Sequence, residues 1–187
     1  MLDRARALFW ARGYSHVSLR EIASEAGVDV ALVSRYFGSK KGLFEETIHD
    51  LPSIDAAQIT DADALVEAAV VLFTEGDHNA DQPSPTTFIL HNAGDSDVGE
   101  AVRRVFHQRW QTPIEQILRD KSQAARFTAA IFGLSVAEKT LQLEGFDAKS
   151  GEGRAQRIRA FLKASLAPTD QAESPRTSDG TSPAGKP

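Results

Sequence analysis

One short segment near the N-terminus places hydroxyl, guanidinium and phenol groups where they cannot all be buried. In the segment VALVSRYF, Val33 and Phe37 lie four residues apart, and we assign both to the core of the protein. Since a helix buries only one face, Ser34, Arg35 and Tyr36 cannot all join them, and some must point to solvent. A short helix that shows such side chains to solvent suits a surface of phosphates and base edges.

Two predicted helices joined by a tight turn would hold this segment. Ser18 precedes a helical run and Glu21 follows three residues later, a capping box in which the two side chains satisfy free backbone donors. Apolar residues then repeat at helical spacing over 19–25. Gly27 can take the positive φ that a tight turn needs, and Asp29 is placed to cap the next helix. This layout predicts a helix-turn-helix, although a three-helix structural bundle with solvated basic residues has the same spacing.

The stretch from residue 2 to about residue 48 resembles the N-terminal domain of the tetracycline-repressor-like (TetR) family of regulators. The matching segments are ARALFWARGY at 5–14, SLREIASEAGV at 18–28 and VSRYFGSKKGLF at 33–44, which span three helices and both turns in register. The resemblance implies an all-helical, homodimeric regulator that binds double-stranded DNA. It is usually a repressor that a small-molecule effector releases from its operator.

The resemblance also implies which residues contact DNA. Arg20 matches a position that contacts a base or a phosphate, and Lys40 matches a basic phosphate clamp; for both, the alternative is a solvated charge. Leu32 matches a groove-facing position, and its alternative is a place in the core. The expected DNA-binding residues are Ser18, Arg20, Val30, Ala31, Leu32, Ser34, Arg35, Tyr36 and Lys40.

Two features depart from the family pattern. Many relatives carry Tyr where this chain has Ser34, so one phosphate contact is expected to be weaker or missing. Relatives also commonly have basic residues ahead of the first helix, whereas this chain begins at Met1 essentially inside it. The Ser34 departure and the acidic composition favour the alternative of a helical small-molecule-binding or interaction module without DNA binding.

Net charge is −5 over 187 residues, but the charges are unevenly distributed. Residues 1–44 carry seven Lys or Arg and four Asp or Glu, whereas residues 51–100 carry ten acidic residues and no Lys or Arg. Residues 101–165 carry twelve basic and six acidic residues. Because the acidic middle would be repelled by phosphate, we expect only the N-terminal end of the molecule to contact DNA.

Composition narrows the class of protein further. The chain has no cysteine, which excludes disulfides, thiolate metal sites and cysteine catalysis. No apolar run approaches the roughly 20 residues that a membrane span needs, and no signal segment is evident at the N-terminus. We therefore expect a cytoplasmic protein with no membrane partner.

The whole chain is predicted to be all-α, since no alternating strand pattern of useful length occurs. About nine helices are expected. Three precede a fourth that begins at Lys40, and the rest lie at about 62–75, 85–91, 97–111 with a restart at Thr112–Pro113, 122–144 and 153–166. The predicted organisation is a helix-turn-helix DNA-binding domain over 1–48, a helical effector-binding and dimerisation domain over 49–167 and a disordered tail over 168–187.

Small side chains recur every fourth residue in the helix predicted over 122–144, forming a ridge that another helix can approach closely. The last predicted helix has an apolar face beside it. Ordinary packing within one chain is the alternative, but the resemblance implies a dimer formed by the last two helices. The expected interface residues are Ala125, Ala129, Gly133, Ala137, Ile158 and Leu162.

Aromatic side chains and a few polar ones gather in the middle helices. They could line a mostly apolar pocket between helices, although aromatics at helical spacing are often plain core. The expected ligand-binding residues are Phe73, Phe88, His91, Phe106, Trp110 and Phe132.

The alternative from another functional class is an enzyme. His91 with Asp95, or His78 with two neighbouring aspartates, could form a metal or general-base site. Each pair lacks a third ligand at useful spacing, so an exposed pair is the simpler interpretation. Glycines 151 and 153 lack the strand–turn–helix context of a phosphate loop. We therefore expect no catalytic residue, no metal and no cofactor.

Overall fold

The computed structural model describes residues 1–49, 51–75, 84–144 and 151–168. All regular secondary structure within these ranges is helical, which confirms the predicted all-α class. The α-helices are α1 (Leu2–Arg12), α2 (Leu19–Ala26), α3 (Val30–Phe37), α4 (Lys40–His49), α5 (Ala62–Glu75), α6 (Pro85–Asn92), α7 (Gly99–Phe106), α8 (Thr112–Leu118), α9 (Lys121–Ser135) and α10 (Gly151–Ser165). Because a π-helical segment joins α7 to α8 in one rod, the described residues contain nine helices.

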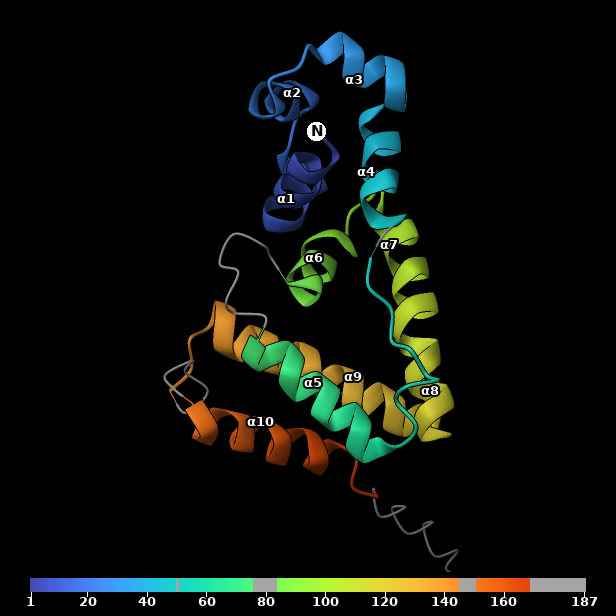
Figure 1. Cartoon of the computed structure of the whole chain (residues 1–187), viewed down its shortest axis with the longest axis vertical. Helices are drawn as coiled ribbons and strands as arrows, with labels where there is room; N and C mark the ends of the chain where they lie inside the picture. The colour runs from blue at the N-terminus through green and yellow to red at the C-terminus, as the bar shows by residue number, and fades with distance from the viewer. Residues whose placement is uncertain (50, 76–83, 145–150, 169–187) are drawn as a thin grey trace, which may run out of the picture.

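The helices run from a small head at one end of the molecule to a three-helix layer at the other (Figure 1). The head consists of α1 to α4, with α3 at its tip. The base layer consists of α5, α9 and α10, in which α10 packs on both of the others. Between them, α6 packs on α1, and the α7–α8 rod connects α4 to the base layer.

The local signals in the head act as predicted. The hydroxyl of Ser18 accepts a hydrogen bond from the N–H of Glu21 at 3.2 Å, and the Glu21 carboxylate accepts one from the N–H of Ser18 at 3.5 Å. Gly27 has a φ of 66° in the turn. The Asp29 carboxylate accepts a hydrogen bond from the N–H of Ala31 at 2.7 Å and so caps α3. These contacts confirm the helix-turn-helix.

Phe44 of α4 lies at the centre of the core that the head shares with α6. It is fully buried, and its ring centroid is 5.2 Å from that of Phe9, 5.3 Å from that of Tyr14 and 5.9 Å from that of Phe88. Phe88 belongs to α6, outside the domain predicted over 1–48. The core of the head therefore continues past that predicted boundary and joins the head to the rest of the chain.

Asn92 joins α6 to α1 by buried hydrogen bonds. Its Oδ1 accepts from the N–H of Tyr14 at 2.7 Å, and its Nδ2 donates to the carbonyls of Phe9 at 3.3 Å and Phe88 at 2.8 Å. Leaving such a buried group unpaired would cost about 1–3 kcal/mol. These bonds therefore favour one orientation of the head against α6.

The α7–α8 rod widens into a π-helical segment over His107–Gln111. Pro113 follows this segment, and a proline ring crowds the carbonyl four residues earlier, here that of Arg109. The wider turn makes room for the ring, and the carbonyl of Arg109 accepts a hydrogen bond from the N–H of Ile54 at 2.9 Å. The restart predicted at Thr112–Pro113 is therefore a continuous rod that also anchors the segment after α4.

Most predicted helix ends agree with the structure, and the helix predicted over 122–144 is the exception. The π-helical turn that extends α9 ends at Thr140, short of the predicted end. Gln142 has a φ of 47°, a left-handed value that a continuing helix does not allow. Residues 76–83, between the helices predicted at 62–75 and 85–91, and the predicted tail beyond residue 168 lie outside the described residues.

Candidate nucleic-acid interface and ligand cavity

The outer face of α3, at the tip of the head, is exposed (Figure 1). Tyr36 is 75% exposed and Leu32 is 43% exposed, whereas Val33 on the inner face is fully buried. This exposure excludes the alternative assignment of Leu32 to the core. Eight of the predicted DNA-binding residues are exposed: Ser18, Arg20, Val30, Ala31, Leu32, Ser34, Arg35 and Tyr36.

The sequence predicts two roles for Ser18, as the cap of α2 and as a DNA contact, and the geometry allows both. Its hydroxyl oxygen accepts the cap hydrogen bond from the N–H of Glu21. A hydroxyl that accepts can still donate its own hydrogen, so Ser18 can cap α2 and donate to a phosphate at the same time. Arg20 follows two residues later on an exposed part of α2.

Lys40, the ninth predicted residue, is partly buried at the start of α4. Its Nζ lies 4.1 Å from the centroid of the Tyr14 ring, a cation–π contact. Burial lowers the pKa of Lys40, while the charges of Asp95 and Asp97 act in the opposite direction. The ammonium group is therefore held in one place rather than freely solvated, which suits a phosphate contact at a helix N-terminus.

The histidine and aspartate considered for a metal or general-base site have packing partners instead. His91 Nδ1 lies 3.3 Å from the carbonyl oxygen of Trp10. Asp95 accepts hydrogen bonds from the hydroxyl of Ser15 and from two backbone N–H groups just before α7. Burial alone would raise the pKa of Asp95, but these hydrogen bonds outweigh it and lower the pKa. No three potential metal ligands gather within the described residues, and the pair around His78 lies outside them.

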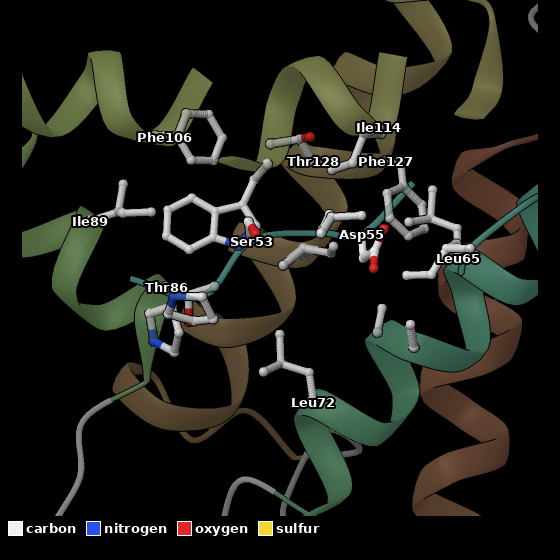
Figure 2. A pocket seen from close by; sticks show the side chains of 18 of the residues that line it. Ser53, Asp55, Leu65, Leu72, Thr86, Ile89, Phe106, Ile114, Phe127 and Thr128 are labelled. Carbon is white, nitrogen blue, oxygen red and sulfur yellow. The ribbon is translucent and has the colours of Figure 1, made fainter. Parts of the chain in front are cut away.

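A cavity of about 380 Å³ lies among α5, α6, the α7–α8 rod and α9 (Figure 2). Three of the predicted ligand-binding residues, Phe106, Trp110 and Phe132, line it. The segment between α4 and α5 contributes a further wall. This volume and mostly apolar lining are typical of sites for small organic molecules.

The other three predicted ligand-binding residues do not line the cavity. Phe73 is 3% exposed in the core of the base layer. Phe88 is fully buried in the core shared by the head and α6. His91 faces the Trp10 carbonyl on α1. Helical spacing placed these side chains on inward faces, but it cannot distinguish a solid core from the wall of a cavity.

Sequence reasoning missed the cavity wall formed by the segment after α4. This segment has no helical or strand periodicity, and the hydrogen bond from Ile54 to the Arg109 carbonyl holds it against the rod. Long-range contacts of this kind, which include the hydrogen bond from the Arg109 guanidinium to the Leu51 carbonyl, bring its side chains to the cavity, so no local pattern could have identified them. The residues concerned are Pro52, Ser53, Ile54, Asp55, Gln58 and Ile59.

Residues 1–47 match the sequence model of the bacterial regulatory proteins of the tetR family. The head is a tetR-family regulatory domain. The family that this domain represents is one of regulators rather than of enzymes. Among the described residues, no helix combines the length and the apolar character that a membrane crossing requires.

Two solved structures share the arrangement of the helices well beyond the head. NalD, the secondary repressor of the MexAB-OprM multidrug efflux pump in Pseudomonas aeruginosa, has a TM-score of 0.63 and 19% identity over 88% of this chain and 93% of its own. HlyIIR, a hemolysin II transcriptional regulator, has a TM-score of 0.59 and 21% identity over 87% of this chain and 93% of its own. At these identities the likeness shows a common fold. No curated protein matches the sequence.

The small-residue ridge of α9 faces outward in this chain. Ala125, Ala129 and Gly133 are exposed, and Ala137 is half-buried. A β-carbon added at Gly133 would meet no described atom within 4 Å. Within the described residues, the ridge is therefore an open surface that a second helix could approach closely.

Ile158 and Leu162 do not belong to that outer surface, contrary to the prediction. They are 2% and 0% exposed, in the core that α10 shares with α5 and α9. Since they are buried within one chain, neither side chain has surface left for a second copy. The exposed large apolar side chain of α10 is instead Phe161, at 39%.

Ion pairs hold α10 against its neighbours. Arg154 donates two hydrogen bonds to the carboxylate of Glu138, at 3.2 and 3.1 Å, and both side chains are more than nine-tenths buried. Arg159 makes a second two-bond pair with Glu67 of α5. A buried pair gains little net energy because both charges lose their hydration, but it fixes the geometry of the helices that carry it. The outer face of α9 and α10 is therefore built on a defined arrangement.

Arg109 links the cavity wall to the end of α4. Its guanidinium group donates hydrogen bonds to the carbonyl oxygens of His49 and Leu51. His49 is the last residue of α4, and Leu51 follows just beyond it. A cation is favourable at this end because the helix dipole is negative there. The next residue along the rod is Trp110, which lines the cavity. A displacement of this wall would therefore move the C-terminal end of α4 through the hydrogen bonds of Arg109.

Proposed function

We propose that the protein is a homodimeric repressor that binds a palindromic operator and is released from it by a small molecule bound in the cavity. The observation that carries this proposal is the exposed outer face of α3 in a head that matches the tetR family over residues 1–47. NalD is a repressor and HlyIIR is a transcriptional regulator, which favours the same role here. A regulator of chromosomal genes acts in the cytoplasm, and we assign the protein to that compartment.

In this proposal α3 enters the major groove of the DNA. Arg35 can donate two hydrogen bonds to O6 and N7 of a guanine, and the exposed Ala31 and Leu32 can contact the methyl groups of thymine. Lys40 and Ser18 contact phosphates, which position the helix without reading sequence. Base specificity therefore rests mainly on Arg35.

The outer face of α9 and α10 is the proposed dimer interface. A two-fold dimer presents two copies of α3 to successive major grooves, roughly 34–36 Å apart, which explains why the operator would be palindromic. The exposed ridge of Ala125, Ala129 and Gly133 allows the α9 helices of the two copies to approach closely. The structural domains proposed are the head over 1–48 and an effector-binding and dimerisation region over 49–167.

Release by an effector requires that the cavity and the head influence each other. Arg109 holds the C-terminal end of α4 beside the cavity wall, and Lys40 stands at the opposite end of the same helix. A ligand that moves Trp110 would therefore shift the phosphate contact through α4. The ligand must bind the two arrangements of the head with different affinity, since otherwise it would not change DNA binding.

Replacing Arg35 with alanine tests the DNA-reading role. Because Arg35→Ala removes a base contact, we expect a loss of about 1–3 kcal/mol, roughly 5- to 150-fold, on the preferred sequence and weaker discrimination against random duplex. Lys40→Ala should weaken binding to both sequences alike, since phosphate contacts carry no sequence information. Gel shifts at two salt concentrations measure both effects.

Arg104→Ala provides the matched control, because Arg104 is an exposed arginine on α7, outside the helix-turn-helix. It should leave affinity and specificity close to those of the unchanged protein. Equal losses on preferred and random duplex for Arg35→Ala would contradict the base-reading role. A complete absence of shifted DNA at low salt would instead favour the alternative of an interaction module without DNA binding.

A further inference from the structure

The cavity is lined by one charged side chain, Asp55. None of the described residues that line it is a lysine, arginine or histidine. Asp55 precedes α5, and its side chain, which is exposed to solvent, borders the apolar lining of the cavity (Figure 2). One of its oxygens accepts a hydrogen bond from the N–H of Ala57 at 2.9 Å. The second carboxylate oxygen keeps its full capacity to accept from, or attract, a group in the cavity.

The nearest arginine along the rod is directed away from the cavity. Arg109 precedes Trp110, but its guanidinium group donates to the carbonyls of His49 and Leu51 and does not line the cavity. On α10, Arg159 pairs with Glu67. The negative charge of Asp55 is therefore not neutralised by a lining residue.

The remaining polar groups of the wall are uncharged and come from Ser53, Gln58, Thr86, Trp110 and Thr128. Thr128 donates its hydroxyl hydrogen to the side-chain oxygen of Gln111 at 2.8 Å, so the Thr128 oxygen is left as an acceptor. Thr86 shares its hydroxyl hydrogen bonds with Ser84 and Ser135. The hydroxyl of Ser53, the amide of Gln58 and the indole N–H of Trp110 can donate to a ligand of either charge. Among the lining residues, discrimination by charge therefore rests on Asp55 rather than on these neutral groups.

Aromatic rings in the cavity wall also favour a positively charged ligand. The ring centroid of Phe106 is 6.0 Å from that of Trp110 and 5.7 Å from that of Phe132, and all three residues line the cavity. The face of an aromatic ring carries partial negative charge and attracts cations. The same rings provide apolar surface for a hydrophobic ligand.

We infer that the cavity selects a predominantly apolar organic cation, with Asp55 as its ionic partner. This inference rests on the proposed role of the cavity as the effector site. Selection arises because apolar contacts contribute to binding of any hydrophobic molecule, while the lining offers a counter-charge only to a positive one. The exposure of Asp55 to solvent limits this preference, since water screens the attraction.

Two ions of nearly equal size, shape and hydrophobicity but opposite charge test the inference directly. Calorimetry measures the two affinities. The full-length protein, without DNA, is titrated with tetraphenylphosphonium and, separately, with tetraphenylborate. We expect the phosphonium ion to bind at least about tenfold more tightly than the borate ion. In Asp55→Asn, which keeps the oxygen that accepts from Ala57, we expect phosphonium affinity to fall about tenfold, while borate affinity stays level or rises.

Asp61→Asn is the matched control. Asp61 likewise accepts a backbone hydrogen bond, from Ala64 at 2.8 Å, and is exposed, but it does not line the cavity. Its replacement should leave the affinities for both ions unchanged. Equal binding of the two ions, no binding of either, or an unchanged phosphonium affinity in Asp55→Asn would overturn the inference. Because no DNA is present, these results are independent of the gel shifts, and a failure of the repressor proposal would be seen there instead.

Discussion

Replacing Ala129 with glutamate is expected to convert the protein into a monomer and to weaken binding to a palindromic operator by on the order of 10²- to 10⁴-fold. Ala129 is exposed at the middle of the α9 ridge. In a two-fold dimer both copies would place the new carboxylate at the same interface, where like charges repel and lose their hydration. A monomer retains each half-site contact but loses the gain from binding two half-sites at once. Light scattering after size-exclusion and gel shifts measure the two effects.

Gln116→Glu adds the same charge to an exposed position of α8, outside the proposed interface. It should leave both the mass of the particle and the operator affinity unchanged. If Ala129→Glu stayed dimeric with unaltered operator binding, the proposed interface on α9 and α10 would be wrong.

Phe44→Ala should lower the free energy of unfolding by about 3–5 kcal/mol, because it removes a fully buried ring and leaves a cavity. Phe44 contacts aromatic side chains of α1 and α6 as well as the turn after α1. The loss should therefore reach both the head and its contact with the rest of the chain. Urea denaturation followed by circular dichroism gives the change.

Tyr36→Ala is the matched control for that experiment, since Tyr36 is an aromatic residue of the same head but is 75% exposed. Surface substitutions of this kind usually change stability by less than about 0.5 kcal/mol. Similar stabilities for the two variants would show that the aromatic cluster around Phe44 does not hold the head in place.

The helix-turn-helix could be predicted from the sequence because its signals are local. A capping box at Ser18, a left-handed glycine at Gly27 and a cap at Asp29 each act within three residues, and all three occur in the structure as predicted. The buried position of Val33 followed from helical spacing alone. Exposure of the opposite face of α3 is the direct consequence.

The rest of the site depends on contacts between distant segments, which spacing does not encode. Periodicity identified Ile158 as an inward or interface residue, but only the structure shows that its apolar face packs on α5 and α9 of the same chain. Helical spacing predicted that Phe88 lines a pocket, but in the structure it lies in the solid core shared by the head and α6. Asp55 was missed because long-range hydrogen bonds, from Ile54 to the Arg109 carbonyl and from the Arg109 guanidinium to the Leu51 carbonyl, anchor its segment against the rod.

The most direct test of the central claim is selection of duplex fragments from a random pool by the full-length protein, followed by sequencing. We expect enrichment of a two-fold symmetric sequence whose half-sites lie about one helical turn apart, with a guanine in each half-site whose enrichment is lost in Arg35→Ala. A pool that remains random after several rounds at low salt, or a motif that Arg35→Ala leaves unchanged, would contradict the claim that the outer face of α3 reads DNA.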